Sequence, residues 1–137
     1  MIRIRNSSGR FIARSFSLGP YKRVTFGQLF EALDKDEQLA VLHHEMAHCE
    51  MHHTEWRILF LLLLPFLLGR LCRNQELQAD QFAAECGHAA GMIKVLEGEC
   101  EGGFLYPSHG MRRGYLKIYE HNKPRFVPVT DSSPGLA

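Results

Sequence analysis

The stretch HHEMAHCEMHH, residues 43–53, places five histidines and two glutamates in eleven consecutive positions. Within it, the residues from His44 to His48 have the spacing H-E-x-x-H. Two histidines four positions apart lie on the same face of a helix, about 5–6 Å from each other, so both imidazoles can bind one metal ion. This spacing constrains the fold strongly, because the segment has to be helical and a ligand from elsewhere has to reach it.

A zinc site that leaves room for a water molecule needs three protein ligands, with histidine nitrogens about 2.0–2.1 Å from the ion. Glu45 is rotated by about 100° from its neighbour His44, so its carboxylate can meet that water instead of the metal. The later segment ELQAD supplies two acids four residues apart, Glu76 and Asp80. Glu76 can be the third ligand, and Asp80 can orient a ligating imidazole. The sequence therefore predicts one Zn²⁺ per chain, bound by His44, His48 and Glu76.

The remaining histidines near the motif are predicted to have other roles. His43 falls on the packing side of the helix, and His53 and His88 are expected to be ordinary packing or surface residues. His52 continues the four-residue spacing from His48, which predicts a position behind the metal ligands or at the surface.

Residues 1–26 are predicted to form β-strands with turns at NSSG and LGP, because MIRIR alternates at period two. We predict one β-hairpin over residues 1–18. The alternative is a mitochondrial transit peptide, since the first 30 residues carry six basic side chains and no acid. No apolar segment of a secretory signal is present at the start, and the four cysteines form no C-x-x-C pair. We therefore expect free thiols and a cytoplasmic protein.

Helices are predicted after the strands. The first begins after Asp34, with Glu37 at the position that completes a capping box. Its predicted apolar stripe consists of Leu39, Leu42, Met46 and Cys49. The metal-binding histidines fall on the opposite side, so this helix is expected to be buried on two faces. A second helix fits residues 74–86, between Asn74 and Gly87, and two more helices follow it.

A chain of 137 residues is long enough for one compact domain. We predict a single α+β domain over residues 1–121, in which N-terminal strands precede the two motif-bearing helices and the C-terminal helices. An extended, proline-containing tail is predicted over residues 122–137. The net charge of +1 produces no electrostatic field strong enough to suggest nucleic acid as the main partner, so we expect none.

Ile58 to Leu68 is an eleven-residue apolar run that contains Pro65. A membrane-spanning helix needs about 20 apolar residues, and a hairpin of two such helices needs about 40. Glu76 lies only 28 positions after His48. A full crossing is therefore excluded if both residues bind one ion. We favour a core position for the run, and the alternatives are contact with a membrane surface or with an oligomer partner.

The motifs resemble those of the gluzincin family that contains the CAAX prenyl proteases and the HtpX-like heat-shock proteases, with its small soluble minigluzincins. VLHHEMAH and ELQADQFAAE match the H-E-x-x-H and E-x-x-x-D helices of that family closely. YPSHGMRRGYL loosely matches a later loop with a Ser/Thr-His step before an Arg-bearing helix. The resemblance covers roughly residues 24–120. It implies a minimal zincin-like catalytic domain and a zinc-dependent endopeptidase that acts on peptides or unfolded proteins.

The same resemblance assigns roles to individual residues. It implies zinc ligands, a general base and a supporting carboxylate: His44, His48 and Glu76, then Glu45, then Asp80. It also implies that His109 helps to stabilise the transition state. Either Arg112 or Arg113 corresponds to the arginine of the last helix.

Other functions stay open beside this one. An ImmA/IrrE-like peptidase, which cleaves a transcriptional repressor, also carries H-E-x-x-H and a later acidic ligand. A non-catalytic module stabilised by zinc would use the apolar run of residues 58–68 as its binding surface. The tail segment RFVPVT, residues 125–130, is either a solvated chain end, which we favour, or an intramolecular inhibitor of the cleft.

Overall fold

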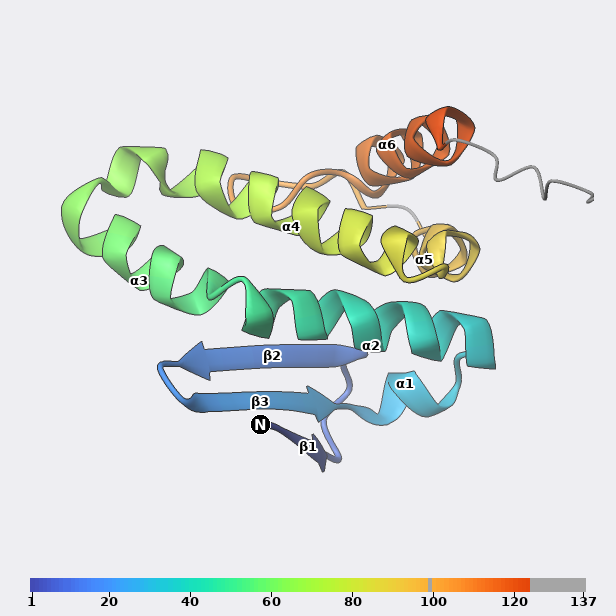
Figure 1. Cartoon of the computed structure of the whole chain (residues 1–137), viewed down its shortest axis with the longest axis horizontal. Helices are drawn as coiled ribbons and strands as arrows, with labels where there is room; N and C mark the ends of the chain where they lie inside the picture. Colours follow the sequence, from blue (N-terminus) through green and yellow to red (C-terminus); the bar gives the residue numbers. More distant parts are fainter. Residues whose placement is uncertain (99, 124–137) are drawn as a thin grey trace, which may run out of the picture.

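The computed structural model describes residues 1–98 and 100–123, in which a three-stranded sheet is followed by helices (Figure 1). The strands are β1 (Ile2–Asn6), β2 (Ala13–Leu18) and β3 (Tyr21–Phe26). The helices are α1 (Gln28–Glu31), α2 (Lys35–Glu50), α3 (His53–Leu63), the 3₁₀ helix η1 (Pro65–Leu67), α4 (Leu68–Glu85), α5 (Ala89–Val95) and α6 (His109–Asn122). This order confirms the predicted α+β class and is consistent with a minimal zincin-like domain.

The strand order of the sheet is β1-β3-β2, so β3 is the central strand. It pairs in parallel with β1 and antiparallel with β2, across the turn at Gly19. The predicted hairpin of residues 1–18 is therefore wrong, whereas the turn at LGP is confirmed. The physical reason is burial, because Val24 and Phe26 of β3 are buried against α2 and the best-buried strand takes the central place.

Residues 7–12 carry the chain from β1 to β2 across the end of β3. The N–H of Gly27 donates to the carbonyl oxygen of Ile12 at 2.9 Å and so ties this crossing down. A Cβ atom at Gly27 would lie 2.1 Å from the carbonyl oxygen of Phe11, so only glycine fits there. The crossing leaves β2 at an edge of the sheet, in contact with α2 and α3 (Figure 1).

Helix α2 begins where the capping box predicts. The Asp34 side chain accepts a hydrogen bond from the N–H of Glu37 at 2.9 Å, and the Glu37 carboxylate accepts one from the N–H of Asp34 at 2.7 Å. The helix is buried on two faces as expected, but its predicted stripe is partly wrong. Leu39 is exposed, and the small Ala40 and Ala47 are fully buried instead. Short side chains there let neighbouring helices pack closely.

Two hydrophobic clusters hold α2 in place, between the sheet and helices α4 and α5 (Figure 1). The cluster on the helical side consists of Ala40, Ala84, Ala89, Met92, Leu96 and Leu116. The cluster on the sheet side consists of Val24, Phe26, Val41 and Cys49. Contacts on both faces fix the rotation of α2 about its axis, and with it the direction of the motif histidines.

Helices α3 and α4, joined by η1, form a hairpin that leads the chain back alongside α2 (Figure 1). Helix α4 begins at Leu68, six residues before the predicted start at Asn74, whose side chain is exposed in the middle of the helix. The prediction missed this because the end of the apolar run continues directly into the helix. Gly87, with φ +92°, follows the helix end as predicted.

The apolar run is not core. The side chains of residues 61–64 and 66 are exposed at the end of the α3–α4 hairpin, so the favoured prediction is wrong. In residues 1–98 and 100–123, no helix combines the length and the apolar character that a bilayer crossing requires. Helix α6 ends at Asn122, the first residue of the predicted tail, and residues 124–137 lie outside the described part of the chain.

Candidate metal centre

Three side chains from α2 and α4 meet at one point. Nε2 of His44 lies 3.1 Å from Nε2 of His48 and 3.5 Å from Oε2 of Glu76, and Nε2 of His48 lies 3.5 Å from Oε1 of Glu76. All three side chains are buried. Two ligands at about 2.0–2.1 Å from a tetrahedral ion are about 3.3 Å apart, so these atoms have the spacing of three corners of a zinc site. Two imidazoles and one carboxylate are also a donor set that zinc accepts.

The fold brings these residues together by simple means. His44 and His48 share a face of α2 because they are four residues apart. Glu76 comes from α4, which the α3–α4 hairpin returns to the side of α2 (Figure 1). Ala79 and Ala83 follow Glu76 at helical spacing on the same face and are fully buried. Their short side chains let the two helices approach closely enough for the donor atoms to meet.

Asp80 supports one of the histidines and is itself held by an arginine. Its Oδ1 lies 2.9 Å from Nδ1 of His44. Arg112 of α6 donates two hydrogen bonds to the Asp80 carboxylate, from Nε to Oδ2 and from Nη2 to Oδ1, both 2.6 Å long. Arg113 points elsewhere and donates from Nη1 to the carbonyl oxygen of Leu96. Of the two arginines that the sequence left open, the structure brings Arg112 to the site.

The charges of the site depend on one another. Burial opposes the charged form of His44, but the carboxylates of Asp80 and Glu76 raise its pKa to about 9. Burial also opposes ionisation of Glu76, yet the hydrogen bond and charge of His44 hold the pKa of Glu76 far below its usual value. Burial and the neighbouring charge of His44 both lower the pKa of His48. His48 is therefore neutral at pH 7, whereas a metal ion bound by His44 would have to displace a proton from it.

His53 contacts the second histidine from behind. Its Nδ1 lies 2.7 Å from Nδ1 of His48, and both rings are buried. Burial, together with the charge of Arg57, lowers the pKa of His53 to about 4, so it is neutral at pH 7. If Nε2 of His48 binds a metal ion, its ring proton has to be on Nδ1, which can then donate to Nδ1 of His53. His52, in the left-handed conformation with φ 55°, makes the turn from α2 into α3 that allows this contact.

This role of His53 was missed by sequence reasoning. A separation of five residues is not a helix-face spacing, and the turn at His52 could not be foreseen. His52 itself is exposed, and its Nδ1 lies 3.0 Å from a carboxylate oxygen of Glu55. His43 contacts the carbonyl oxygen of Leu39 through Nδ1 at 2.8 Å and takes no part in the donor set.

A pocket of about 430 Å³ opens beside the donor set. Its walls come from α2, α3, α4, α6, strand β2 and the loop before α6: Glu45, His48, Arg57, Glu76, Arg112, Tyr106, Ala13, Arg14 and Ser15. Glu45 therefore faces the same open space as two of the three candidate donor side chains, His48 and Glu76. The pocket also has an extended strand along one side, since β2 is an edge strand.

Arg57 contacts the candidate donor Glu76, which sequence reasoning also missed. It donates from Nη2 to Oε1 of Glu76 at 2.9 Å and from Nε to Oε1 of Gln75 at 2.7 Å. Its partner Glu76 is 19 positions away, and only the folded α3–α4 hairpin brings the two together. These charge-assisted hydrogen bonds fix the orientation of the Glu76 carboxylate.

His109 is not brought to this pocket. It is the first residue of α6, and its Nδ1 lies 2.7 Å from the carbonyl oxygen of Gly98. Among the described residues of the loop before α6, Tyr106 is the one that lines the pocket. The phenol of Tyr106 is thus better placed than the imidazole of His109 to meet a molecule bound there.

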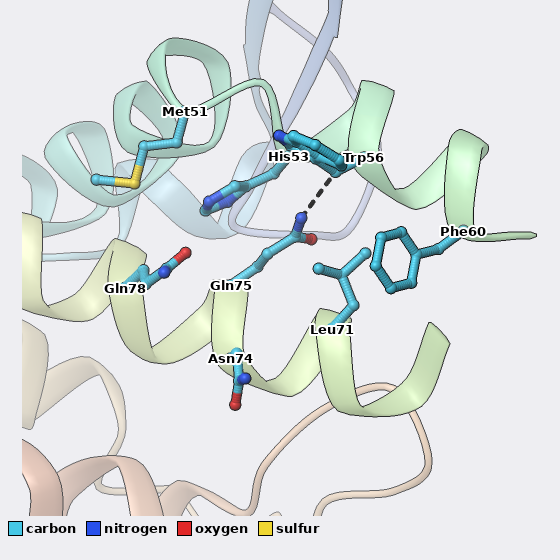
Figure 2. A pocket seen from close by; sticks show the side chains of 8 residues that line it. All are labelled: Met51, His53, Trp56, Phe60, Leu71, Asn74, Gln75 and Gln78. Atoms are coloured by element: carbon cyan, nitrogen blue, oxygen red, sulfur yellow. Dashed lines mark hydrogen bonds between the residues drawn. The ribbon is translucent and has the colours of Figure 1, made fainter. Parts of the chain in front are cut away.

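A second pocket, of about 460 Å³, lies on another side of the α3–α4 hairpin. Figure 2 shows that Trp56 and Phe60 of α3 face Leu71 and Gln75 of α4 across this space. His53 forms one wall, and the Gln75 side chain donates to its carbonyl oxygen at 3.3 Å (Figure 2). The pocket holds no further metal-binding cluster among the described residues, and its chemistry is apolar with a few amides.

Comparison with known proteins agrees with the geometry. The profile of Peptidase family M48 matches residues 16–68, which is less than half of the chain and includes H-E-x-x-H but not Glu76. No curated protein and no solved structure matches the chain. The family match therefore supports the M48 metallopeptidase family for this protein, on the segment that carries His44, Glu45 and His48.

Proposed function

We propose that the protein is a zinc-dependent endopeptidase in which Glu45 is the general base. The observation that supports this most is one open pocket in which Glu45 lies beside a three-atom donor set. A structural zinc site is closed by four protein ligands, whereas a catalytic one has three and an open position. The described residues supply three, His44, His48 and Glu76, which favours catalysis over a zinc-stabilised interaction module.

Each residue of the site has a defined task in this proposal. A bound zinc ion supplies Lewis-acid chemistry, since it acidifies a water molecule and polarises a peptide carbonyl. Glu45 accepts the proton of the attacking water and passes it to the leaving amine. Asp80 holds His44 and His53 holds His48, so that both Nε2 atoms stay directed at the same point.

The developing negative charge on the substrate needs donors in the same pocket. Arg112 and Tyr106 both line it, one with a guanidinium and one with a phenol. Either group can stabilise an oxyanion if it lies close enough to the substrate carbonyl. Because Arg112 is already bound to Asp80 by two hydrogen bonds, Tyr106 is the freer donor.

The substrate is an extended peptide segment. Ala13, Arg14 and Ser15 of the edge strand β2 form one wall of the pocket. An edge strand has unpaired backbone groups that can bind an extended chain by strand addition. A segment bound in this way passes alongside the donor set, which suits unfolded proteins or exposed loops.

The test combines metal analysis with proteolysis of an unfolded protein such as casein. Glu45→Gln keeps the shape and the metal but loses the proton acceptor, so turnover should fall by about 10²–10⁴-fold with zinc content unchanged. Glu50→Gln is the matched control, because Glu50 is an exposed acid on the same helix, paired with Lys22 at 3.0 Å. If the zinc-loaded wild type cleaves nothing, and so behaves as Glu45→Gln does, the protein is an interaction module and not a peptidase.

The ligand assignment is tested on its own by zinc binding. His44→Ala, His48→Ala and Glu76→Ala should each lower zinc affinity sharply, and His43→Ala should leave it unchanged. An equal loss of zinc affinity in all four variants would contradict the assignment of His44 and His48, and not His43, as the ligands from α2. The match to family M48 also favours this proposal over an ImmA/IrrE-like repressor-cleaving peptidase.

A further inference from the structure

The end of the α3–α4 hairpin is an apolar surface without a cover among the described residues. We call residues 58–67, which run from the end of α3 through η1, the apolar tip. Leu61, Leu62, Leu63 and Phe66 within it are 57%, 74%, 66% and 73% exposed. Figure 1 shows the hairpin projecting past the end of α2. A contiguous exposed apolar patch of this kind marks a contact with a partner or with a lipid phase, whereas single exposed apolar side chains do not.

The apolar surface goes around the tip and is not confined to one side. Trp56 and Phe60 lie on one side of α3, against the pocket in Figure 2. Ile58 and Leu61 lie on the other side and line a separate apolar pocket of about 240 Å³. A folded partner with a flat surface covers one such side. A fluid apolar phase covers both sides and the turn together, which favours a lipid layer over a second copy of the chain.

The polar groups nearest the tip fit a lipid headgroup region. Residues 56–75 contain three arginines and no acid. Arg57 is paired with Glu76, which leaves Arg70 and Arg73 without an acidic partner among the described residues. Arg70, in the first turn of α4, is exposed. Trp56 and Tyr106 are half exposed beside the hairpin, and both residue types are enriched where membranes meet water. The sequence around the tip therefore combines an apolar end, amphipathic aromatic rings and positive charge, which complements anionic headgroups.

The size of the tip fits shallow insertion. Residues 58–63 rise by about 9 Å at roughly 1.5 Å per residue. The hydrocarbon core of a bilayer is about 30 Å thick, so the tip reaches into one leaflet only. This depth agrees with the finding that none of the described helices can cross a bilayer. It also leaves the metal-binding residues, at the base of the hairpin, outside the lipid.

We propose that the apolar tip inserts into the headgroup–acyl boundary of a membrane that contains anionic lipids. The base of the hairpin is tied to the candidate metal centre, since Arg57 of α3 binds Glu76 of α4. Insertion consequently holds the open pocket close to the membrane surface. The docking itself does not depend on peptidase activity, so it can be tested separately.

Flotation of the full chain with liposomes tests the proposal. One set of vesicles consists of phosphatidylcholine alone, and in the other set one third of the lipid is the anionic phosphatidylglycerol. We expect binding that is stronger to the anionic vesicles. Leu62→Ser combined with Phe66→Ser should lower the binding constant by about 100-fold or more, since burying each such side chain contributes roughly one factor of ten or more. The fold should survive, because both side chains are largely exposed.

The matched control is Met111→Ser combined with Ile118→Ser, which removes two exposed apolar side chains from α6. These changes should leave flotation unchanged. The proposal is overturned if the wild type does not float with either vesicle, or if the tip variant floats as well as the control. A dimer in solution that the tip variant loses, without any flotation of the wild type, would assign the tip to a second copy and likewise overturn it.

Discussion

Replacing Arg112 by methionine should destabilise the metal-free protein severely. Arg112 donates two hydrogen bonds of 2.6 Å to Asp80, and Asp80 is fully buried. Removing one partner of a buried ion pair leaves an uncompensated charge and costs about 3–5 kcal/mol. His44 remains 2.9 Å from Asp80 and keeps part of the compensation. The expected loss is therefore at the lower end, about 3 kcal/mol, or roughly 10 °C in Tm for a domain of this size.

The measurement is urea unfolding followed by circular dichroism, in the presence of a chelator so that metal binding does not add to stability. Arg113→Met is the matched control, since the neighbouring arginine donates to the carbonyl oxygen of Leu96 and is only partly buried. It should lose about 1 kcal/mol. Equal losses in the two variants would refute the assignment of Arg112 to the buried network.

A double variant separates loss of the pair from loss of packing. Asp80→Asn added to Arg112→Met removes the carboxylate that has lost its arginine. The double variant should then be more stable than the sum of the two single changes predicts, by about 1–3 kcal/mol. Simple additivity would mean that the two side chains act independently despite their contact.

Three further outcomes follow from other contacts. His53→Ala should lower zinc affinity about 10–100-fold in a chelator competition, because it removes the acceptor behind a metal ligand, whereas His88→Ala should not. Partial burial raises the pKa of Glu55, but hydrogen bonds, first of all the one from Ser17, outweigh burial and lower this pKa from 4.5 to about 2. Its contribution to stability is complete above pH 4.5 and is lost as pH falls towards 2, so Glu55→Gln should flatten the acid side of a Tm–pH profile. Removing residues 124–137, which lie outside the described part, should raise the rate of casein cleavage if the tail restrains the cleft, and an unchanged rate would assign it as a solvated end.

The parts of the site that lie within one helix could be predicted from the sequence. The capping box at Asp34 and Glu37 involves residues three positions apart, so its start signal is complete in the local sequence. The spacing of His44 and His48 places both on one face of the same helix for the same reason. Glu76 could be chosen as the third donor because Glu76 and Asp80 are four residues apart and share one face of a second predicted helix.

The contacts between distant segments could not be predicted in this way. Alternation at period two indicates that residues 1–6 form a strand, but it does not report which strand lies beside it. Pairing depends on burial of β3, which is known only once α2 covers the sheet. Arg57 meets Glu76, and His53 meets His48, through the turn at His52 and the length of the α3–α4 hairpin. Neither the turn at His52 nor the length of the hairpin is marked by a recognisable sequence motif.

The apolar tip shows a different limit of sequence reasoning. Hydrophobicity indicates that a segment avoids water, but it does not indicate what replaces the water. In this fold the polar contacts between α3 and α4 that hold the site are at the base of the hairpin, where Arg57 binds Gln75 and Glu76. The base is therefore fixed by directional contacts, whereas Leu62 and Phe66 at the far end make none that the site requires. A chain built in this way can change the chemistry of its tip without moving the metal-binding atoms, because the two depend on different contacts.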